Sequence, residues 1–490
     1  MKKTYYLLIG IAILCLQLNL PAQSIIRGPY LQSGTPNSMV IKWRTNSSTS
    51  SQVWYGTSPS NLAFTKTVNG SRTDHEVLVN GLSANSTYYY AVGNTAGQLS
   101  VPGSDYYFRT SPNPGSVQPI RAWILGDAGK ANNTQREVRD AFYDFNGSNH
   151  IDMILLLGDN AYESGTDAEY QAAMFENMYE GRLINSVVWP AFGNHDGLSA
   201  LSSTQTGPYY EIFTNPTNAE AGGVPSGTEA YYSFDYGNIH VIVLDSDDSD
   251  REPGSPQMNW LEADLAATTQ DWKVVTFHHP PYTQDASDSN NKETDMRSMV
   301  LPILEAYNVD LVLAGHDHVW ERSYLIHGHY GVSNTWDPVT MGINLGDGRL
   351  DGDGPYIKEA GNGPSAVGTV YIVAGSAGSA GAITGYHPVM YETLGEKGSM
   401  YMEVTGNQMD IKFIRDIGTI DDYLTIIKQS VVGNPPTVSI TAPADGASYN
   451  APQTIAISAD ASDSDGSITQ VEFFVNGLPA GVDNQAPYAV

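Results

Sequence analysis

The chain has 490 residues and carries 53 Asp and Glu against 24 Lys and Arg, for a formal charge of −29 at pH 7. This length exceeds what one hydrophobic core accommodates and predicts two to four domains. The negative charge excludes a general nucleic-acid or anionic-membrane binder, because both need a basic surface. A solubilising acidic surface is the simplest interpretation of the charge.

The first 22 residues have the pattern of an export signal. Two lysines precede an apolar stretch at 5–18, and the small residue Ala22 follows it. The stretch is short for a membrane span, so we predict a signal peptide at 1–22, cleaved after Ala22, and no stable membrane insertion. Cys15, the only cysteine, lies within that signal, so the mature protein has no disulfide. The protein is expected to be secreted, whether periplasmic, on the cell surface or extracellular.

Residues 25–112 contain short alternating apolar and polar stretches separated by turns. This spacing is typical of a β-sandwich, here of the fibronectin type, whose simplest role is scaffolding. A linker rich in proline and glycine follows at 111–116. The predicted strands are 38–44, 51–55, 75–79 and 105–109.

From residue 118 the pattern changes to strands that alternate with helices, which predicts a layered α/β sandwich. We place this central domain at 118–416. Its predicted strands are 121–125, 152–157, 187–191, 241–244, 272–277, 309–314, 368–373, 400–404 and 409–414. Its predicted helices are 135–145, 168–179, 256–267 and 296–307.

A second change of composition at 433–436 starts a C-terminal module, which we place at 434–490. Stretches at 437–443 and 471–477 predict an Ig-like bacterial surface β-sandwich, with too few strands to close, so a truncated domain is expected. Asp460, Asp463 and Asp465 could form a calcium-stiffened loop, and a solvated acidic turn is an equal alternative.

Five polar clusters follow apolar stretches of the central domain. In open α/β sheets ligands bind at the carboxyl ends of strands. Each cluster alone is weak evidence for a functional site, since Gly-Asp commonly marks a turn and a lone histidine is more often a core residue. Together they predict a metal centre, with Asp159 as a carboxylate shared by two ions. The clusters are Gly126-Asp127-Ala-Gly129, Gly158-Asp159-Asn-Ala-Tyr162, Gly193-Asn194-His195-Asp196, Val275-Thr-Phe-His278 and Gly315-His316-Asp-His318.

This series resembles the purple acid phosphatases, a branch of the calcineurin-like metallophosphoesterases. The resemblance extends over residues 25 to about 416, because Gly28-Pro-Tyr-Leu-Gln32 also resembles the N-terminal domain of that family. In the wider superfamily the first cluster is Asp-x-His, whereas this chain has Gly129 at the histidine position. The resemblance implies that Tyr162 compensates, because a phenolate suits Fe(III) and distinguishes the purple branch.

The resemblance implies a multidomain fold. A fibronectin III-like N-terminal β-sandwich would precede a central α/β four-layer metallophosphoesterase sandwich, with a partial Ig-like β-sandwich at the C-terminus. Two metal ions about 3.5–4 Å apart would clamp the attacking and leaving oxygens. Fe(III) would be held by Asp127, Asp159, Tyr162 and His318, and a divalent Zn, Fe or Mn ion by Asp159, Asn194, His278 and His316.

The implied activity is hydrolysis of small phosphate monoesters by a metal-bound hydroxide, as in an acid phosphatase. His195 would orient the substrate or protonate the leaving alkoxide, with Asp196 holding its ring, and the alternative for His195 is a structural role. Asn194 would also contact the substrate. His279 either contacts the substrate or is only a buried or surface neighbour of a ligand, and the two interpretations are equal alternatives. Plant-like members of the family carry further substrate-contacting histidines after the segment that corresponds to 278–282. In this chain the following residues, 283–297, contain no histidine. The natural substrate and pH optimum therefore stay open.

Two other functions stay open at this stage. A phosphodiesterase or nucleotide hydrolase would use the same metal site, and only a comparison of substrates separates the two. A non-catalytic surface adhesin would be expected to lack metal ligands, but all seven ligand positions are filled here. The sequence indicates neither the divalent metal nor the oligomeric state.

Overall fold

The computed structural model describes residues 23–176, 178–283, 291–360, 366–385, 387–429, 436–463 and 467–490. The chain forms two compact units, divided between Lys428 and Gln429. In the described part of the chain, no helix has the length and apolar character needed to cross a membrane. The predicted signal peptide at 1–22 lies outside the described residues and stays a prediction.

The N-terminal strands of the larger unit wrap around a core that includes Met39 and Trp43. The predicted strands 38–44 and 51–55 are the two ends of one long strand, β2. Its pairing register with β3 shifts midway. Strand β3 pairs along both halves of β2, whereas β1 pairs only with the first half and β4 only with the second. The strands are β1 (Ile25–Gln32), β2 (Ser38–Gly56), β3 (Phe64–Asn80), β4 (Thr87–Asn94), β5 (Gly97–Gln98) and β6 (Tyr107–Arg109).

These strands continue into the first sheet of the central part, because β1 pairs in parallel with β9 through Leu31 and Val187. Along this sheet the order is β17-β22-β21-β20-β7-β8-β9-β1. Strands β7, β8 and β9 are parallel, so their carboxyl ends share one edge. The bounds are β7 (Ile120–Leu125), β8 (Met153–Leu156), β9 (Val187–Pro190), β17 (Tyr356–Glu359), β20 (Gly398–Thr405), β21 (Gln408–Arg415) and β22 (Ile420–Gln429).

A second sheet has the order β10-β11-β12-β13-β18-β14-β19, and its strands β11, β12, β13 and β18 are parallel. One core contains Ile124 and Leu155 of the first sheet together with Val274 and Leu313 of the second, so the sheets pack against each other. The bounds are β10 (Tyr232–Tyr236), β11 (Ile239–Val243), β12 (Trp272–Thr276), β13 (Leu311–Ala314), β14 (Trp320–Ser323), β18 (Val370–Ala374) and β19 (Met390–Leu394).

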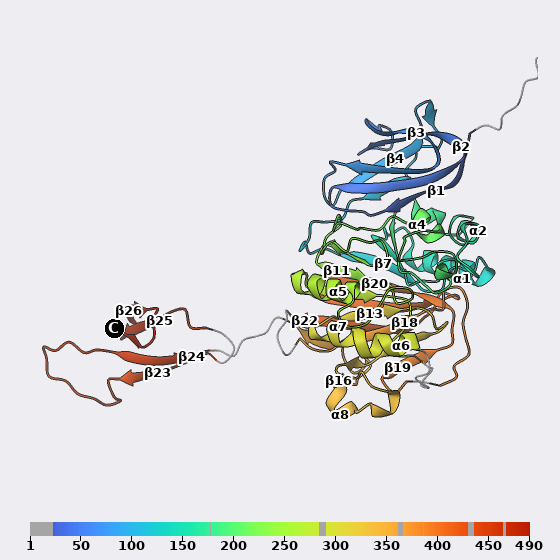
Figure 1. The fold of residues 1–490 in the computed structure, drawn as a ribbon. Helices are drawn as coiled ribbons and strands as arrows, with labels where there is room; N and C mark the ends of the chain where they lie inside the picture. The colour runs from blue at the N-terminus through green and yellow to red at the C-terminus, as the bar shows by residue number, and fades with distance from the viewer. Residues whose placement is uncertain are drawn as a thin grey trace, which may run out of the picture. The chain divides into compact units, whose positions relative to one another are not determined.

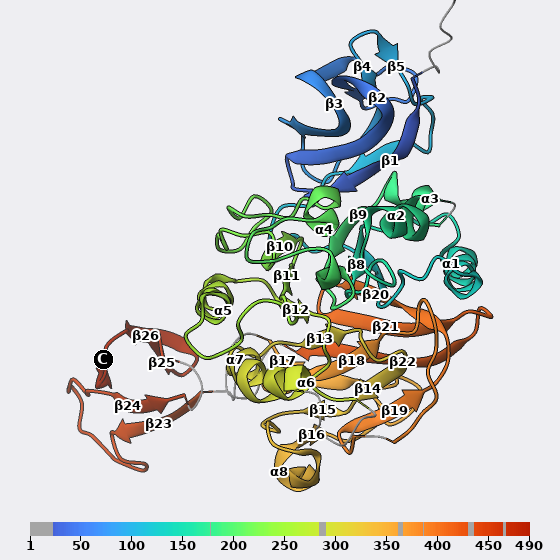
Figure 2. The same ribbon diagram turned by 45° about the vertical axis from the view of Figure 1, so that its right-hand side comes forward.

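Helices cover the sheets. Helix α1 packs against β20 and β21, and both Figure 1 and Figure 2 show α6 and α7 beside β13 and β18. A small hairpin of β15 (Leu325–Ile326) and β16 (Gly342–Asn344) lies near α8. The helices are α1 (Asn133–Asn146), α2 (Asp167–Tyr170), α3 (Glu180–Leu183), α4 (Pro208–Ile212), α5 (Pro256–Ala267), α6 (Asn291–Asp295), α7 (Leu301–Ala306) and α8 (Pro338–Met341).

Two predicted helices and the predicted end of the central domain differ from the structure. The predicted helix 168–179 is interrupted after α2 by a π-helical turn, Gln171–Phe175. The predicted helix 296–307 begins as a π-helical turn and becomes regular only in α7, near the proline that cannot donate a backbone hydrogen bond. Strand β22 pairs with β21, so the sheet extends past 416, where the sequence placed the domain end.

The smaller unit is a separate β-structure with a small core of Ala459, Phe473 and Tyr488. Asp460 is exposed on β24 opposite Ser439. Asp465 lies outside the described residues, so the calcium loop stays a prediction. The strands are β23 (Thr437–Ala442), β24 (Ser458–Ser462), β25 (Val471–Val475), β26 (Leu478–Asp483) and β27 (Tyr488–Ala489).

Candidate metal centre

The five polar clusters meet where carboxyl ends of parallel strands from both sheets converge. Asp127 follows β7 and Asp159 follows β8 in the first sheet, while His278 follows β12 in the second. The Nδ1–H of His278 donates to the carbonyl of Leu157 at 2.8 Å, which links the two sheets and leaves Nε2 facing the centre. The sheets thus supply the side chains from opposite sides.

The backbone around the centre is strained and tightly packed. Asp127, Asp159 and His316 adopt positive φ angles of 56°, 53° and 70°. Each such residue costs on the order of 1–3 kcal/mol and persists only where its surroundings hold it. A Cβ added to Gly129 would lie 2.3 Å from the amide nitrogen of Ala161, so this backbone has no space for a histidine at the position where the wider superfamily has one.

One group of oxygen and nitrogen atoms surrounds the Tyr162 hydroxyl. It lies 2.8 Å from Oδ1 of Asp127, 2.8 Å from Oδ2 of Asp159 and 3.2 Å from Nε2 of His318. The Oγ of Ser379 lies 2.9 Å from Nδ1 of His318 and fixes that ring. These four side chains are the ones predicted to hold Fe(III).

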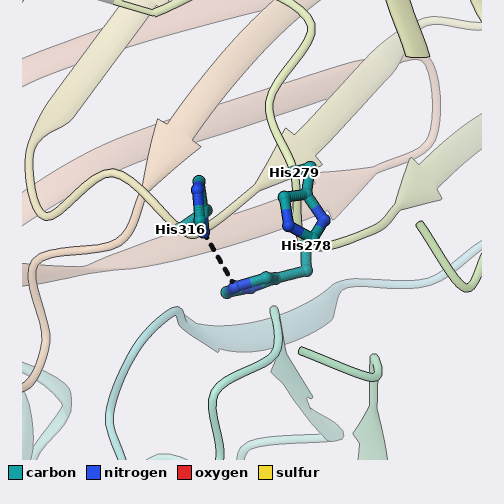
Figure 3. A group of neighbouring side chains, drawn as sticks. All are labelled: His278, His279 and His316. Atoms are coloured by element: carbon teal, nitrogen blue, oxygen red, sulfur yellow. Dashed lines mark hydrogen bonds between the residues drawn. The ribbon is translucent and has the colours of Figure 1, made fainter. Parts of the chain in front are cut away.

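A second group surrounds the side-chain oxygen of Asn194. That oxygen lies 2.9 Å from Nε2 of His278 and 3.0 Å from Nδ1 of His316, and the two imidazoles are 3.3 Å apart (Figure 3). Oδ1 of Asp159 lies 3.3 Å from Nε2 of His278. Asp159 therefore directs one carboxylate oxygen to each group, as a bridging ligand would.

The electrostatics of these side chains fit bound cations. Burial raises the pKa of Tyr162, and the carboxylates of Asp127 and Asp159 raise it further. Burial would lower the pKa of His278, but Asp159 outweighs it and raises that pKa to about 10. A cation would remove both protons by offsetting the carboxylate charge. Phenolate, carboxylate, imidazole and amide are suitable donors for iron, zinc or manganese, so these residues fit the implied metals.

His195 lies beside this centre with its ring partly exposed. Its backbone N–H donates to Oδ1 of Asp159 at 2.8 Å, and its ring centroid lies 4.4 Å from that of Tyr162. The Glu163 carbonyl lies 2.6 Å from Nδ1 of His195, so Nδ1 carries the hydrogen. Nε2, which lies 3.8 Å from Oδ2 of Asp159, is thus the nitrogen available to a substrate.

The expectation that Asp196 holds the ring of His195 is wrong. Asp196 is fully buried and accepts hydrogen bonds from the Tyr170 hydroxyl at 2.5 Å, the Gly193 N–H at 3.0 Å and the Asn160 side chain at 2.9 Å. Burial and then the nearby charge of Asp159 raise its pKa to about 7. Its side chain turns inward and fixes the loops that present Asp159 and Asn194.

His279 lies behind the centre. Its Nδ1 is 3.0 Å from the Ser246 hydroxyl, and its ring centroid is 4.5 Å from that of His316 (Figure 3). It is only 2% exposed. His278, His279 and His316 form one of the residue groups able to hold a metal ion. Contact of His279 with substrate stays a prediction.

Sequence reasoning missed two acidic side chains at the centre. Oε1 of Glu293, from α6, lies 3.9 Å from Nε2 of His316, and Glu293 is 6% exposed. Glu293, His316 and Asp317 form another group able to hold a metal ion. Asp317 lies between His316 and His318 in one of the five clusters, so its position in the sequence could have marked it as a candidate. Glu293 follows no apolar strand, and nothing in its local sequence marks it.

Comparisons with known proteins identify the families that parts of this chain match. The Calcineurin-like phosphoesterase family matches residues 120–320, the Purple acid phosphatase N-terminal domain matches 27–110, and the Bacterial Ig domain matches 436–490. Probable purple acid phosphatase 20 of Arabidopsis thaliana is 29% identical over 344 residues, covering 65% of this chain and 73% of the relative. Purple acid phosphatase 23 of the same plant is 28% identical over 379 residues, covering 65% and 78%.

Two solved structures share the fold. Purple acid phosphatase PPD1 from yellow lupin (Lupinus luteus) seeds aligns with a TM-score of 0.59 at 18% identity, covering 82% of this chain and 75% of that one. PhoD aligns with a TM-score of 0.59 at 16% identity, covering 84% and 92%. The resemblance to the purple acid phosphatases is therefore confirmed, and the chain is a phosphoester hydrolase with a calcineurin-like phosphoesterase domain, a purple acid phosphatase N-terminal domain and a bacterial Ig domain.

Proposed function

We propose that this chain is a secreted phosphatase that hydrolyses phosphate monoesters at a dinuclear metal centre. The position of Asp159 supports the proposal most directly. One of its oxygens lies 2.8 Å from the Tyr162 hydroxyl and the other lies 3.3 Å from Nε2 of His278. A carboxylate shared in this way is what two adjacent cations require.

Fe(III) is the ion that we assign to the site of Asp127, Asp159, Tyr162 and His318, since phenolate and carboxylate are hard, anionic donors. A divalent ion, Zn, Fe or Mn, would occupy the site that Asp159 shares with the amide and imidazole donors. When bound, the two ions would supply the attacking hydroxide and neutralise charge on the phosphate oxygens. The second group of ligands is Asp159, Asn194, His278 and His316.

His195 is the side chain that we assign to the substrate. Its Nδ1–H is engaged by the Glu163 carbonyl, so Nε2 carries any additional proton. A protonated Nε2 would donate a hydrogen bond to the phosphate group or a proton to the departing alkoxide. Asn194 would border the substrate beside the second metal. Asp196 would act only through the backbone that it fixes.

The remaining parts of the chain would export and carry this centre. We infer a signal peptide at 1–22, a fibronectin-type domain at 25–112, a catalytic domain from 118 and an Ig-like module at 434–490. The catalytic domain would have two helical layers outside the two sheets. Successive residues of β7 support this layering, because Ile124 lies in the core between the sheets and Trp123 packs on Phe142 of α1.

A comparison of substrates on one preparation tests the proposal. The purified protein would be stripped with a chelator, reconstituted with iron and zinc, and assayed with 4-nitrophenyl phosphate and bis(4-nitrophenyl) phosphate. The proposal predicts metal-dependent hydrolysis with a higher kcat/KM for the monoester. A preference for the diester would indicate a phosphodiesterase, and no hydrolysis after verified metal uptake would contradict an enzymatic role.

A further inference from the structure

A lysine without a predicted role lies at the rim of the metal centre. Lys130 follows Gly129 in the first cluster, and its Nζ lies 4.0 Å from the centroid of the Tyr162 ring. The hydroxyl of the same tyrosine contacts Asp127 and Asp159 at 2.8 Å each. The ammonium group therefore lies over the ring of the tyrosine whose hydroxyl belongs to the proposed ferric site.

No carboxylate among the described residues pairs with Lys130, although acidic residues outnumber basic ones 53 to 24. Other basic side chains near the centre are paired: Lys292 contacts Asp247, and Arg251 lies 3.4 Å from Asp295. A partly exposed ammonium without an anionic partner, at a site that handles phosphate, is complementary to an anionic ligand.

The stem of Lys130 is packed. A Cβ added to Gly378 would lie 3.1 Å from Cγ of Lys130, so this glycine leaves just the space that the lysine stem needs. The carbonyl of Gly378 accepts a hydrogen bond at 2.9 Å from the Asn132 side chain, which also caps helix α1. A side chain held in this way loses less conformational entropy when it binds a ligand.

His195 borders the same tyrosine, with a ring-to-ring distance of 4.4 Å, so Lys130 and the proposed substrate-binding histidine both pack on Tyr162. We propose that Lys130 binds a non-bridging oxygen of the substrate's phosphate group and is a substrate-binding residue of this hydrolase. This role rests on the proposed phosphatase function. The competing role is a cation that acts on the Tyr162 ring alone.

The test compares Lys130→Gln, Lys130→Arg and a matched control, Lys412→Gln. Lys412 is also partly exposed, and its Nζ lies 5.7 Å from the centroid of an aromatic ring, that of Phe145. Each full-length protein would be reconstituted with metals and checked by thermal unfolding. The readouts are the Kd for inorganic phosphate by calorimetry, kcat and KM for 4-nitrophenyl phosphate, metal content and the visible absorption spectrum.

We expect Lys130→Gln to weaken phosphate binding about tenfold, the usual effect of losing one charge-assisted contact, and to raise KM by a similar factor. Metal content and absorption would be unchanged, Lys130→Arg would keep most of the affinity, and Lys412→Gln would match the wild type. An unchanged phosphate affinity with a shifted absorption band would overturn the proposal in favour of the ring-only role. Loss of metal from Lys130→Gln would overturn it in favour of a structural role.

The same measurements separate failure of the phosphatase proposal from failure of the role of Lys130. If the reconstituted wild-type protein itself binds no phosphate and hydrolyses no monoester, both the proposed function and the role of Lys130 are overturned. If the wild type does both and Lys130→Gln does so equally well, only the role of Lys130 is overturned.

Discussion

His195 has the two features that a proton donor needs, a fixed ring and a free nitrogen. Nδ1 is held by the Glu163 carbonyl at 2.6 Å, and the ring packs on Tyr162. We predict that His195→Ala lowers kcat about 10²- to 10⁴-fold, the usual contribution of a general acid, without loss of metal. Steady-state kinetics and metal analysis on the same sample check this. A variant that loses both metals would show that His195 is structural.

Glu293 is positioned to orient His316. Its carboxylate lies 3.9 Å from Nε2 of that ring, while Nδ1 faces Asn194. Carboxylates behind metal-bound histidines fix the ring and its tautomer, and their loss typically costs 10- to 100-fold in metal affinity. We expect Glu293→Gln to weaken binding of the divalent ion by about this factor, measured by competition with a chelator. The exposed helical residue Glu262 provides the control, and equal affinities in Glu293→Gln and Glu262→Gln would contradict this role.

At the scale of single residues, the sequence indicated the types of the candidate ligands but not the direction of every side chain. The clusters indicated the candidate ligands because each follows an apolar stretch. They did not reveal side-chain direction: Asp196 begins a short 3₁₀ turn that points its carboxylate inward to Tyr170. Glu293 and Lys130 reach the centre only through tertiary packing, so no local pattern predicts them.

At the level of elements, one buried ionic contact joins the two sheets. Asp422 of β22 accepts hydrogen bonds from Arg322 of β14 at 2.7 and 2.8 Å, from Trp320 at 2.9 Å and from Arg349 at 2.9 Å. Burial raises the pKa of Asp422, but its hydrogen bonds and the arginine charges outweigh this and lower it. The Trp320-Glu-Arg322 segment therefore has a structural role here.

Removing that carboxylate would leave the Arg322 charge buried and unpaired. We predict that Asp422→Ala lowers the free energy of unfolding by about 3–5 kcal/mol, as is typical of a broken buried ion pair. Denaturant titration measures this change. The matched control is Asp421→Ala, at the exposed neighbouring residue, which is expected to change the free energy of unfolding by no more than about 0.5 kcal/mol. Equal effects of the two substitutions would contradict the role of the contact.

A second buried contact joins β10, β11 and α5. Nδ1–H of His240 donates to Asp235 and Nε2–H to Asp264, both at 2.8 Å, so both ring nitrogens carry hydrogens and the imidazole is charged. Burial would lower its pKa, but the hydrogen bonds and charges of the two carboxylates raise it to about 9. The ordinary value for an exposed histidine is about 6.5.

A raised pKa means that the folded state holds this proton more tightly than the unfolded state. The stabilisation is complete below about pH 6.5 and is lost as the pH rises through about 9. The difference corresponds to roughly 3 kcal/mol. We predict that the unfolding free energy falls by about this amount between pH 6 and pH 10, and falls less in His240→Gln, which cannot titrate. A steeper fall in the variant than in the wild type would contradict this.

Helices and strands were predictable from the sequence where a single hydrophobic pattern runs through the whole element. Strands β8 and β13 are continuous apolar stretches, as expected for parallel strands buried on both faces. Strand β22 was missed because two aspartates follow its first residue, and the buried one, Asp422, has its charge paired by Arg322 only in the folded chain. The break after α2 depends on packing around a π-helical turn, which helical periodicity does not indicate.

Over the whole molecule, the sequence indicated several β-rich parts around a central α/β domain, and the family matches confirm this organisation. It did not indicate that β1 pairs with β9, which makes the N-terminal strands continuous with the catalytic sheet. The sequence also did not show how the candidate ligands of the two sheets come together. Their convergence depends on packing between strands about 120 residues apart, as in the contact of His278 with Leu157.

The dinuclear centre with a tyrosine ligand is the central claim, and a visible absorption spectrum with metal analysis tests it most directly. We predict a broad charge-transfer band from the protein with about two metal ions per chain. Tyr162→Phe should lose the band, because the phenol oxygen that lies 2.8 Å from both Asp127 and Asp159 is the proposed ligand. A colourless protein with two divalent ions would contradict the ferric–phenolate site, and a protein that binds no metal after reconstitution would contradict the centre itself.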